Sequence, residues 1–276
     1  MPCYNHGEFI EEAVDSVLQQ SYQNIEIIIV DDASTDKNVR EKINAIQEKD
    51  SRIKSIFLDE NSGPSEARNR GIEAAEGLYI LPLDADDRID PTYVEKAVSV
   101  IESNPDIGVV YCEADFFGTV QGKWKLPQYS FPEILFYNMV FSTALYRKTD
   151  WKRYGGYNKN MRDGLEDWDF WLNFTTEQKT FIRIPETLFF YRQRERILTR
   201  NGSIEREKSI QLLSTIFLNH RDLYSANIHH FFDRLPLLIK THHLAETHKN
   251  EQIKTLFKRK LGRYTLSLKK KLKKQK

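Results

Sequence analysis

The sequence predicts an α/β protein with a mostly parallel central sheet, helices on both faces of that sheet, and a C-terminal helical extension. Apolar, strand-like runs alternate with helix-like segments up to about residue 195, and two of these runs end directly in acidic residues. From Ile204 onward the apolar periodicity is helical, without strand signals. We therefore expect two domains, residues 1–202 and 203–276.

The first part of the chain predicts a turn followed by alternating helices and strands. Pro2–Gly7 is turn-like, and the spacing of the next apolar residues predicts a helix over 9–20. The β-branched run Ile25–Val30 is too continuous for a half-exposed strand, so it predicts a strand buried on both faces, which ends at Asp31 and Asp32. The elements expected next are a helix over 38–49, a strand over 53–58, and a helix over 66–75 capped by Ser65.

A second acidic stretch organises the middle of the chain. The apolar run Leu78–Leu83 predicts a strand that ends at the segment Asp84-Ala85-Asp86-Asp87. Aromatic residues crowd the stretch 116–139, which we interpret either as the wall or lid of a pocket or as plain core packing. The regular elements expected beyond the acids are a helix over 93–102, strands over 107–112 and 140–146, a helix entered near Glu166, and a strand over 188–194.

One strand is expected but is not present in the sequence. A turn such as Pro2–Gly7 at the start of a helix should follow a central strand, yet only Met1 precedes it. We expect either that translation starts upstream of Met1 or that the gene is truncated. In-frame Val- and Ile-rich codons upstream would support the first explanation.

The two acidic stretches predict a ligand site. Ligands in open α/β sheets bind at the carboxyl ends of strands. Three carboxylates within four residues repel one another unless a cation is present, and oxygen ligands on a short turn suit Mg²⁺ or Mn²⁺ better than zinc. The alternative is an acidic turn that caps the following helix, with Asp90 and Pro91 at its start. The residues alone leave both interpretations open.

Charge is distributed unevenly along the chain. The net charge is +1, but residues 254–276 carry eleven basic residues and no acid, so residues 1–253 carry −10. This split favours a catalytic body with a basic anchor over a body that binds nucleic acid. No run of about 20 apolar residues, no signal peptide and no metal-ligand spacing of the two cysteines is present. We expect a cytoplasmic protein.

Five motifs occur together, in order, over about residues 2–195. As a set they closely resemble family 2 glycosyltransferases of the GT-A fold, although each motif alone is weak. The missing first strand is the main departure from the family pattern, and the extension after residue 203 lies outside the resemblance. The motifs are Pro2-Cys3-Tyr4-Asn5, Val30-Asp31-Asp32-Ala33-Ser34-Thr35-Asp36, Ala67-Arg68-Asn69-Arg70-Gly71, Leu83-Asp84-Ala85-Asp86-Asp87 and Glu166-Asp167.

The resemblance implies a binding site for a nucleotide diphosphate sugar donor, favouring UDP over GDP. Pro2 and Tyr4 would line the pocket of the base, and Asp32 would accept a hydrogen bond from a uracil-type base. Arg68 would lie beside the same base. Arg192 and Arg194, at the end of the last predicted strand, would meet the diphosphate.

The resemblance also implies a divalent cation, Mn²⁺ or Mg²⁺, and a general base. Asp84 would face the ribose or the metal, and Asp86 would ligate the cation that bridges the diphosphate. Asp167 would take the proton of the attacking hydroxyl, since a sugar hydroxyl is a poor nucleophile. Trp168 and Trp171 would either stack on a sugar ring or, as we favour, pack in the core.

The activity expected is therefore an inverting, metal-dependent glycosyltransferase of bacterial surface polysaccharide synthesis. Its acceptor would be a saccharide or a lipid-linked saccharide. The rival hypotheses are a receiver domain, which the triple carboxylate and the length disfavour, and an inactive relative that binds nucleotide sugars without turnover. The basic tail is interpreted either as an anchor to an anionic membrane surface or as a solvated tail or oligomer contact.

Overall fold

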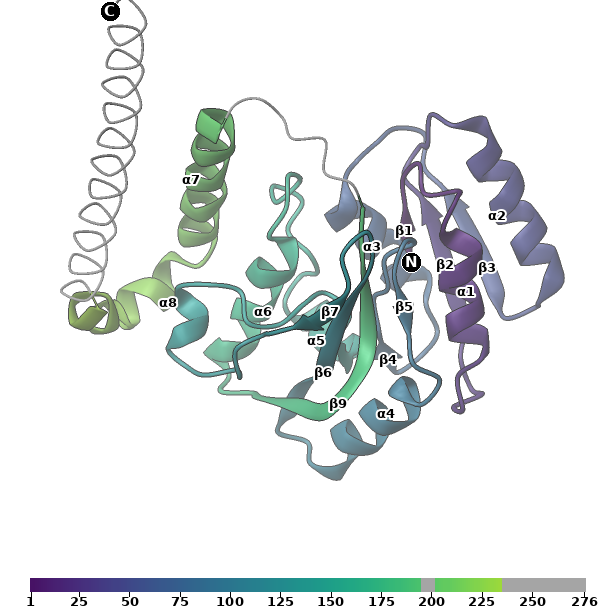
Figure 1. Ribbon diagram of the computed structural model, residues 1–276. Helices are drawn as coiled ribbons and strands as arrows, with labels where there is room; N and C mark the ends of the chain where they lie inside the picture. The colour runs from purple at the N-terminus through teal and green to yellow at the C-terminus, as the bar shows by residue number, and fades with distance from the viewer. Residues whose placement is uncertain (195–201, 235–276) are drawn as a thin grey trace, which may run out of the picture. The chain divides into compact units, whose positions relative to one another are not determined.

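Two β-sheets and the helices around them form the first of two compact units, Met1–Tyr224, in the computed structural model (Figure 1). The structure describes residues 1–194 and 202–234, so the second unit, Ser225–Lys276, is described only up to residue 234. The predicted α/β fold with a helical region after the sheets is confirmed. The domain boundary after residue 202 stays a prediction, and the basic tail over 254–276 lies outside the described residues.

The first sheet is parallel and has the strand order β1-β2-β3. Its central strand is buried on both faces, as the β-branched run predicts, because successive side chains point to opposite sides of a strand. Ile27 and Ile29 pack with α1 and α2, whereas Ile28 and Val30 pack with Ala67 of α3. The bounds are β1 Pro2–Cys3, β2 Ile27–Asp31, β3 Ile53–Phe57, α1 Ile10–Leu18, α2 Lys37–Lys49 and α3 Pro64–Ala74.

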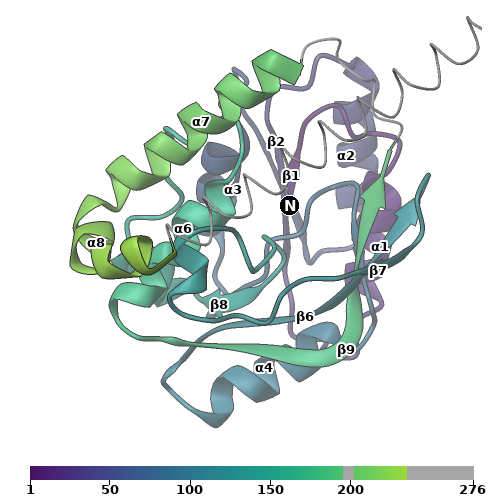
Figure 2. The ribbon, with the colours of Figure 1, turned by 60° about the vertical axis from the view of Figure 1, so that its left-hand side comes forward.

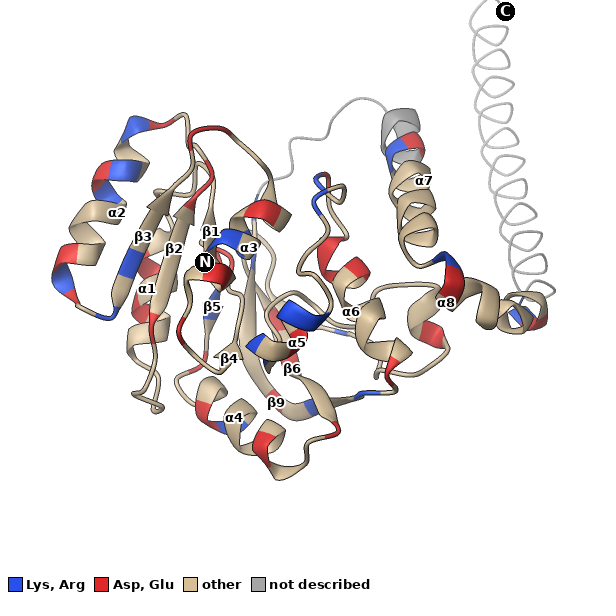
Figure 3. Ribbon diagram, turned by 180° about the vertical axis from the view of Figure 1, so that it is seen from behind, with Lys and Arg blue, Asp and Glu red and all other residues tan. Residues whose placement is uncertain are grey.

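The starts of α2 and α3 show two ways of capping a helix. Asp36 caps α2 by accepting a hydrogen bond of 3.0 Å from the Asn38 amide, and α2 then carries charges of both signs (Figure 3). The predicted cap of α3 at Ser65 is wrong. The helix begins at Pro64 after Gly63, whose φ of +86° suits glycine, and Ser65 is buried inside the first turn.

The second sheet is mixed, with the strand order β4-β8-β6-β9-β5 and β7 paired to β6. The long strands β6 and β9 run parallel, and the other pairs are antiparallel. The bounds are β4 Tyr79–Ile80, β5 Arg88–Ile89, β6 Ile107–Gly118, β7 Gly122–Trp124, β8 Leu145–Arg147 and β9 Thr180–Gln193.

Several predicted strands differ in length from those in the structure. The strand expected over 78–83 has only two residues, because β4 pairs with the short β8 alone among the described strands. The strands expected over 107–112 and 188–194 are longer, since β6 and β9 stay paired as far as Gly118 and Gln193. The aromatic stretch begins as a strand pair, with Phe116 stacked on Trp124 at 5.2 Å between ring centroids, which favours the packing interpretation there.

Of the remaining helices, α4 and α5 pack against strands of the second sheet. Tyr93 in α4 donates a hydrogen bond of 2.8 Å to the Thr143 carbonyl, which ties α4 to the segment before β8. No helix of the described residues is long and apolar enough to cross a membrane. The bounds are α4 Tyr93–Ser103, η1 Glu133–Leu135, α5 Lys148–Arg153, α6 Glu166–Thr176, α7 Gly202–Asn219 and α8 Arg221–Ala226 (Figure 2).

A cavity of about 630 Å³ separates the two sheets. Its lining includes Ile28 of β2, Ile80 of β4 and Gly71 of α3, together with apolar side chains of α1 and α4. The edge strands β1 and β4 border this cavity, and neither pairs with the other. At its rim the Met1 ammonium donates to the Ile28 carbonyl at 2.7 Å, and burial lowers the pKa of this amine to about 5.

Candidate active site

The acidic turn lies between β4 and β5, and its Ala85 belongs to the buried cluster that contains Cys3 of β1 and Ile29 of β2. Its backbone closes through a hydrogen bond of 3.1 Å from the Asp87 amide to the Asp84 carbonyl. Asp84 is the most exposed of the three acids, with 32% of its side chain accessible, whereas Asp86 and Asp87 are buried. Asp84 is therefore the carboxylate that the turn offers to a ligand most openly.

Asp87 connects the turn to β9. Its Oδ1 accepts a hydrogen bond of 2.8 Å from the Arg192 amide. Burial and the nearby Asp84 carboxylate raise the pKa of Asp87 to about 9, although the Arg192 amide opposes this shift. Asp87 thus binds protein backbone.

Two cationic or potentially cationic side chains face Asp86. Arg194 approaches Oδ2 with its Nη2 at 3.2 Å, and His6 Nδ1 lies 3.6 Å from Oδ1. Arg194 also lies 3.0 Å from His6 Nε2, so the three side chains form a closed group. Burial raises the pKa of Asp86 and lowers that of His6, while their mutual attraction opposes both shifts. His6 is absent from the predicted site residues, and its sole signal in the sequence is its place in the first turn.

Arg192 also lies against the acidic turn, but its guanidinium is already engaged. Its Nε donates to the Asp86 carbonyl at 2.7 Å, and it forms an ion pair with Glu12. The guanidinium carbon also lies 4.5 Å from the ring centroid of Phe9 and 4.2 Å from that of Phe117. The predicted contact of Arg192 with a diphosphate stays a prediction.

The predicted base pocket brings together the end of β2 and the first turn. Both carboxylate oxygens of Asp32 accept backbone hydrogen bonds, 2.7 Å from the Ser62 amide and 2.9 Å from the Gly63 amide. The Asn5 side-chain oxygen accepts a hydrogen bond of 2.9 Å from the Thr35 amide, which ties the first turn to the turn after β2. Tyr4 is 41% exposed beside Asn5, and Pro2 is half-buried in β1. The roles of these residues toward a base stay predictions.

Arg68 joins the acidic turn to the start of α6. It is buried in α3, and its Nη2 lies 2.7 Å from Asp84 Oδ1 while its Nη1 pairs with Glu166 Oε1 at 2.5 Å. The two carboxylates raise the pKa of Arg68 against the opposing effect of burial. Because one guanidinium holds both acids, the acidic turn and the first residue of α6 belong to a single site.

Asp167 follows Glu166 and is half-buried. The helix begins after Leu165, whose φ of 61° turns the chain sharply into α6. One carboxylate oxygen of Asp167 accepts a hydrogen bond of 2.8 Å from the Trp168 amide, and the other accepts one of 3.0 Å from Asn138 Nδ2. Burial, reinforced by the Glu166 carboxylate, raises the pKa of Asp167 to about 7. A carboxylate with this pKa suits proton abstraction near neutral pH.

The two tryptophans of α6 are buried packing residues. Trp168 donates through its indole nitrogen to the Ile134 carbonyl at 2.7 Å, and Trp171 donates to the Val140 carbonyl at 3.0 Å. Both are at most 3% exposed, so neither offers a ring face to a sugar in this structure. The packing interpretation is the one that fits.

The acidic turn fits a divalent cation only in part. Asp84 and Asp86 supply the hard oxygen atoms that Mg²⁺ and Mn²⁺ prefer. Among residues 1–194 and 202–234, however, no three His, Cys, Asp or Glu side chains gather in a way that would hold a metal ion. The two carboxylates therefore fit a cation that takes most of its ligands from a diphosphate and water.

Comparisons with known proteins agree with this arrangement. The family model described as "Glycosyl transferase family 2" matches residues 1–162, which covers the acidic turn and ends before Asp167. An uncharacterized glycosyltransferase of Methanocaldococcus jannaschii is 30% identical over 78% of this chain and 75% of its own length. The putative teichuronic acid biosynthesis glycosyltransferase TuaG of Bacillus subtilis is 44% identical over 34% of this chain and 37% of its own.

Two solved structures share the fold. TarS of S. aureus in complex with UDP has a TM-score of 0.60 at 21% identity, covering 79% of this chain and 64% of that one. The mannosyltransferase PcManGT of Pyrobaculum calidifontis, in complex with GDP-Man and Mn²⁺, has a TM-score of 0.59 at 18% identity, covering 80% and 62%. The chain thus spans less than two thirds of TuaG and of both solved chains.

Proposed function

The chain belongs to glycosyl transferase family 2, and from that premise we propose that it moves a sugar from a nucleotide diphosphate donor to a saccharide hydroxyl. The observation that carries the proposal is the Arg68 bridge. It joins Asp84 of the acidic turn to Glu166, the neighbour of Asp167, which supports a donor site next to a base. The complexes of TarS with UDP and of PcManGT with GDP-Man support a nucleotide donor, and we favour a UDP-sugar.

Asp167 acts as the general base in this proposal. Its carboxylate takes the proton of the acceptor hydroxyl while that oxygen bonds to the anomeric carbon of the donor. The bond from the anomeric carbon to the diphosphate oxygen breaks at the same time, and the electron pair leaves with the nucleoside diphosphate. Attack from the face opposite the leaving group inverts the anomeric centre.

The acidic turn provides for the charge of the leaving group. Asp84 and Asp86 would hold a divalent cation, which stabilises negative charge on the departing diphosphate when it is bound. Arg194 and His6 already face Asp86, so the turn accommodates positive charge at this position. The Mn²⁺ in the PcManGT complex supports such a cation here.

The donor site is tested by calorimetric titration with UDP and with GDP, each with and without Mn²⁺. We expect metal-dependent binding of one nucleotide, and Asp86→Ala should abolish that dependence. Asp59→Ala, an exposed acid outside the turn, is the matched control and should bind as the wild-type chain does. Equal nucleotide affinity in the two variants would contradict the assignment of Asp86, and binding without any turnover would favour the inactive relative.

We place the reaction in bacterial surface polysaccharide synthesis, with a saccharide or lipid-linked saccharide as acceptor. The similarity to TuaG supports this setting. The basic composition of residues 254–276 supports attachment to an anionic membrane surface, which would bring the enzyme to a lipid-linked acceptor. The chain should sediment with phosphatidylglycerol vesicles but not with phosphatidylcholine vesicles, and deletion of 254–276 should abolish sedimentation. Failure of the intact chain to sediment would contradict the attachment.

A further inference from the structure

Buried side chains of other elements donate hydrogen bonds to the backbone of the loop that carries Asn138. This segment, residues 133–140, consists of the single turn η1 and an irregular stretch, and it belongs to no strand. Three of its carbonyl groups accept side-chain hydrogen bonds: Ile134 from Trp168, Val140 from Trp171, and Leu135 from the Tyr224 hydroxyl at 3.0 Å. Two of these donors lie on α6 and the third lies on α8.

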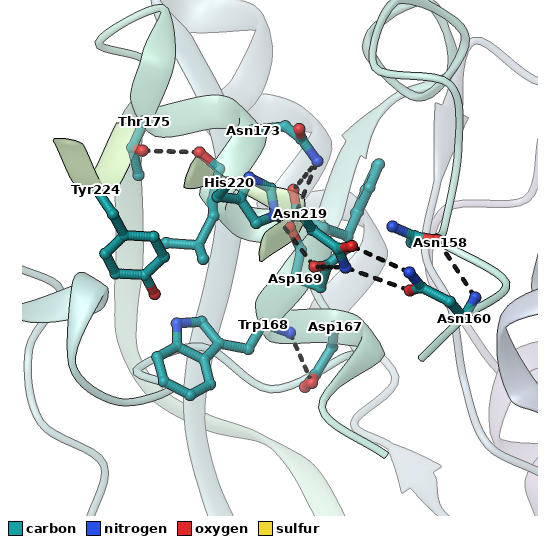
Figure 4. A network of polar contacts seen from close by, with 12 residues as sticks. Asn158, Asn160, Asp167, Trp168, Asp169, Asn173, Thr175, Asn219, His220 and Tyr224 are labelled. Atoms are coloured by element: carbon teal, nitrogen blue, oxygen red, sulfur yellow. Dashed lines mark hydrogen bonds and ion pairs between the residues drawn. The ribbon is translucent and has the colours of Figure 1, made fainter. Parts of the chain in front are cut away.

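The junction between α7 and α8, formed by Asn219 and His220, is anchored to Asp169 of α6, two residues beyond Asp167 (Figure 4). His220 Nε2 lies 3.1 Å from Asp169 Oδ1, and both side chains are at least nine-tenths buried. Asn219 donates to the same oxygen at 2.7 Å and exchanges hydrogen bonds with Asn160. The Tyr224 amide donates a hydrogen bond to the His220 carbonyl, so these two residues lie one helical turn apart.

These contacts close a ring through the candidate base. Asp169 of α6 binds His220, which precedes α8, and Tyr224 of α8 binds Leu135 of the 133–140 loop. Asn138 of that loop donates a hydrogen bond to Asp167, which lies on α6 again. Burial raises the pKa of Tyr224, so its hydroxyl keeps the proton that it donates. Burying a histidine, a carboxylate and a phenol costs desolvation that apolar side chains would avoid if they had only to dock a helix.

We propose that His220 and Tyr224 are positioning residues: through Asp169 and Leu135 they fix the 133–140 loop and α6 so that Asn138 and Asp167 stay aligned. This inference rests on the proposed role of Asp167 as the base. Displacing a catalytic group by about 1 Å can cost up to about 100-fold in rate, so a loosened loop should slow the chemical step. It should leave nucleotide binding unchanged, because the contacts of Arg68 with Asp84 and Glu166 are not altered in the variants.

The sharpest variant is Tyr224→Phe, which removes one hydroxyl and keeps the buried ring. We expect faster amide hydrogen exchange in residues 133–140 and a kcat lowered about 3- to 30-fold, with UDP-GlcNAc and GDP-mannose as donor probes. The Kd of the bound nucleoside diphosphate should stay within about 2-fold of wild type. His220→Leu should act in the same direction, whereas His220→Gln, which keeps a donor toward Asp169, should restore most of the kcat. His229→Gln, at an exposed histidine, is the control.

Three results would overturn the inference. Unchanged exchange in 133–140 would show that Tyr224 does not hold the loop, and faster exchange with unchanged kcat would show that the loop does not position the base. A lowered melting temperature, with amide exchange in 133–140 and kcat both unchanged, would show that the contacts only stabilise the fold. If the wild-type chain transfers no sugar, the function proposed above is contradicted. Faster amide exchange in the variants would then still show that Tyr224 and His220 hold the loop.

Discussion

The proposed donor side and the proposed acceptor side of the site are held by different kinds of interaction. The proposed donor side comprises the first turn, the end of β2 and the acidic turn. A hydrogen bond to Asn5 ties the first turn to the turn after β2, and ion pairs hold the acidic turn: Asp86 with Arg194, and Asp84 with Arg68. The acceptor side comprises the 133–140 loop, α6 and α8. There, buried side chains donate mostly to backbone carbonyl groups, as Trp168 and Tyr224 do.

This difference matches what the proposed function requires of each side. Charged side chains on a partly exposed turn can exchange one cationic partner for another, which a diphosphate and its cation require. Hydrogen bonds from bulky buried donors to backbone fix a position instead, and a base needs a fixed position. Arg68 is the one described residue that ion-pairs with both sides, since Glu166 begins α6. The predictions below separate the two sides, from the largest effect to the smallest.

Asp167→Asn should separate the two sides most clearly. The amide cannot take a proton, so turnover should fall about 10²- to 10⁴-fold. Nucleotide affinity should stay near the wild-type value, because Asp167 lies on the acceptor side. Release of nucleoside diphosphate measures the first quantity and calorimetry measures the second. Turnover within a few fold of wild type would remove Asp167 from the role of base.

Arg68→Met should damage both sides at once. It leaves the Asp84 and Glu166 carboxylates without their shared countercharge, and breaking a buried pair in this way costs about 3–5 kcal/mol. The free energy of unfolding, measured in urea, should fall by an amount of this order, and nucleotide binding and turnover should both weaken. Arg70→Met, at a half-exposed arginine of the same helix, is the control. A loss confined to one side would show that Arg68 does not join them.

A strand-forming segment fused ahead of Met1 should strengthen the donor side alone. A short run of valine and isoleucine residues would enter the cavity between β1 and β4, bury apolar surface and move the ammonium out of it. We expect the melting temperature to rise by more than about 4 °C, the shift that roughly 1–2 kcal/mol gives in a domain of this size. A segment of serine and glycine of equal length should not have this effect. Equal melting temperatures for the two fusions would show that the cavity accepts no strand.

The raised pKa of Asp167 should give the acceptor side its own pH dependence. Turnover should fall as the pH drops below about 7, where the base becomes protonated. Folding raises this pKa from about 4, so the stability that the proton contributes is present below pH 4 and is lost as the pH rises to 7. Asp167→Asn should therefore melt at a higher temperature than wild type at pH 8 and near the same temperature at pH 4. Equal melting temperatures at pH 8 would contradict the shift.

The donor side could be predicted from the sequence better than the acceptor side. Acids that directly follow apolar runs mark the ends of strands, so the sequence alone singles out Asp32, Asp84 and Asp86 as candidates. Nothing near Asn138, His220 or Tyr224 signals a role, because their partners lie 29, 51 and 89 residues away in the chain. The contacts of His6 and Arg194 with Asp86 cannot be predicted from the sequence for the same reason.

The fold shows the same limit. Periodicity predicts β2, α2 and α4 closely, because burial on one or both faces leaves a pattern within the segment itself. It does not predict the lengths of β4, β6, β8 and β9, which depend on how far a partner strand continues. It also places the cap of α3 wrongly, since the cap depends on the φ of Gly63 rather than on a polar side chain.

The most direct test of the division between the two sides is one set of calorimetric titrations with UDP and with GDP, each with and without Mn²⁺. The wild-type chain, Asp86→Ala and Asp167→Asn would be titrated side by side, with turnover measured on the same samples. We predict that Asp86→Ala loses metal-dependent binding, whereas Asp167→Asn keeps it and loses turnover. Loss of metal-dependent binding in both variants, or retention of it in both, would contradict the division between the two sides.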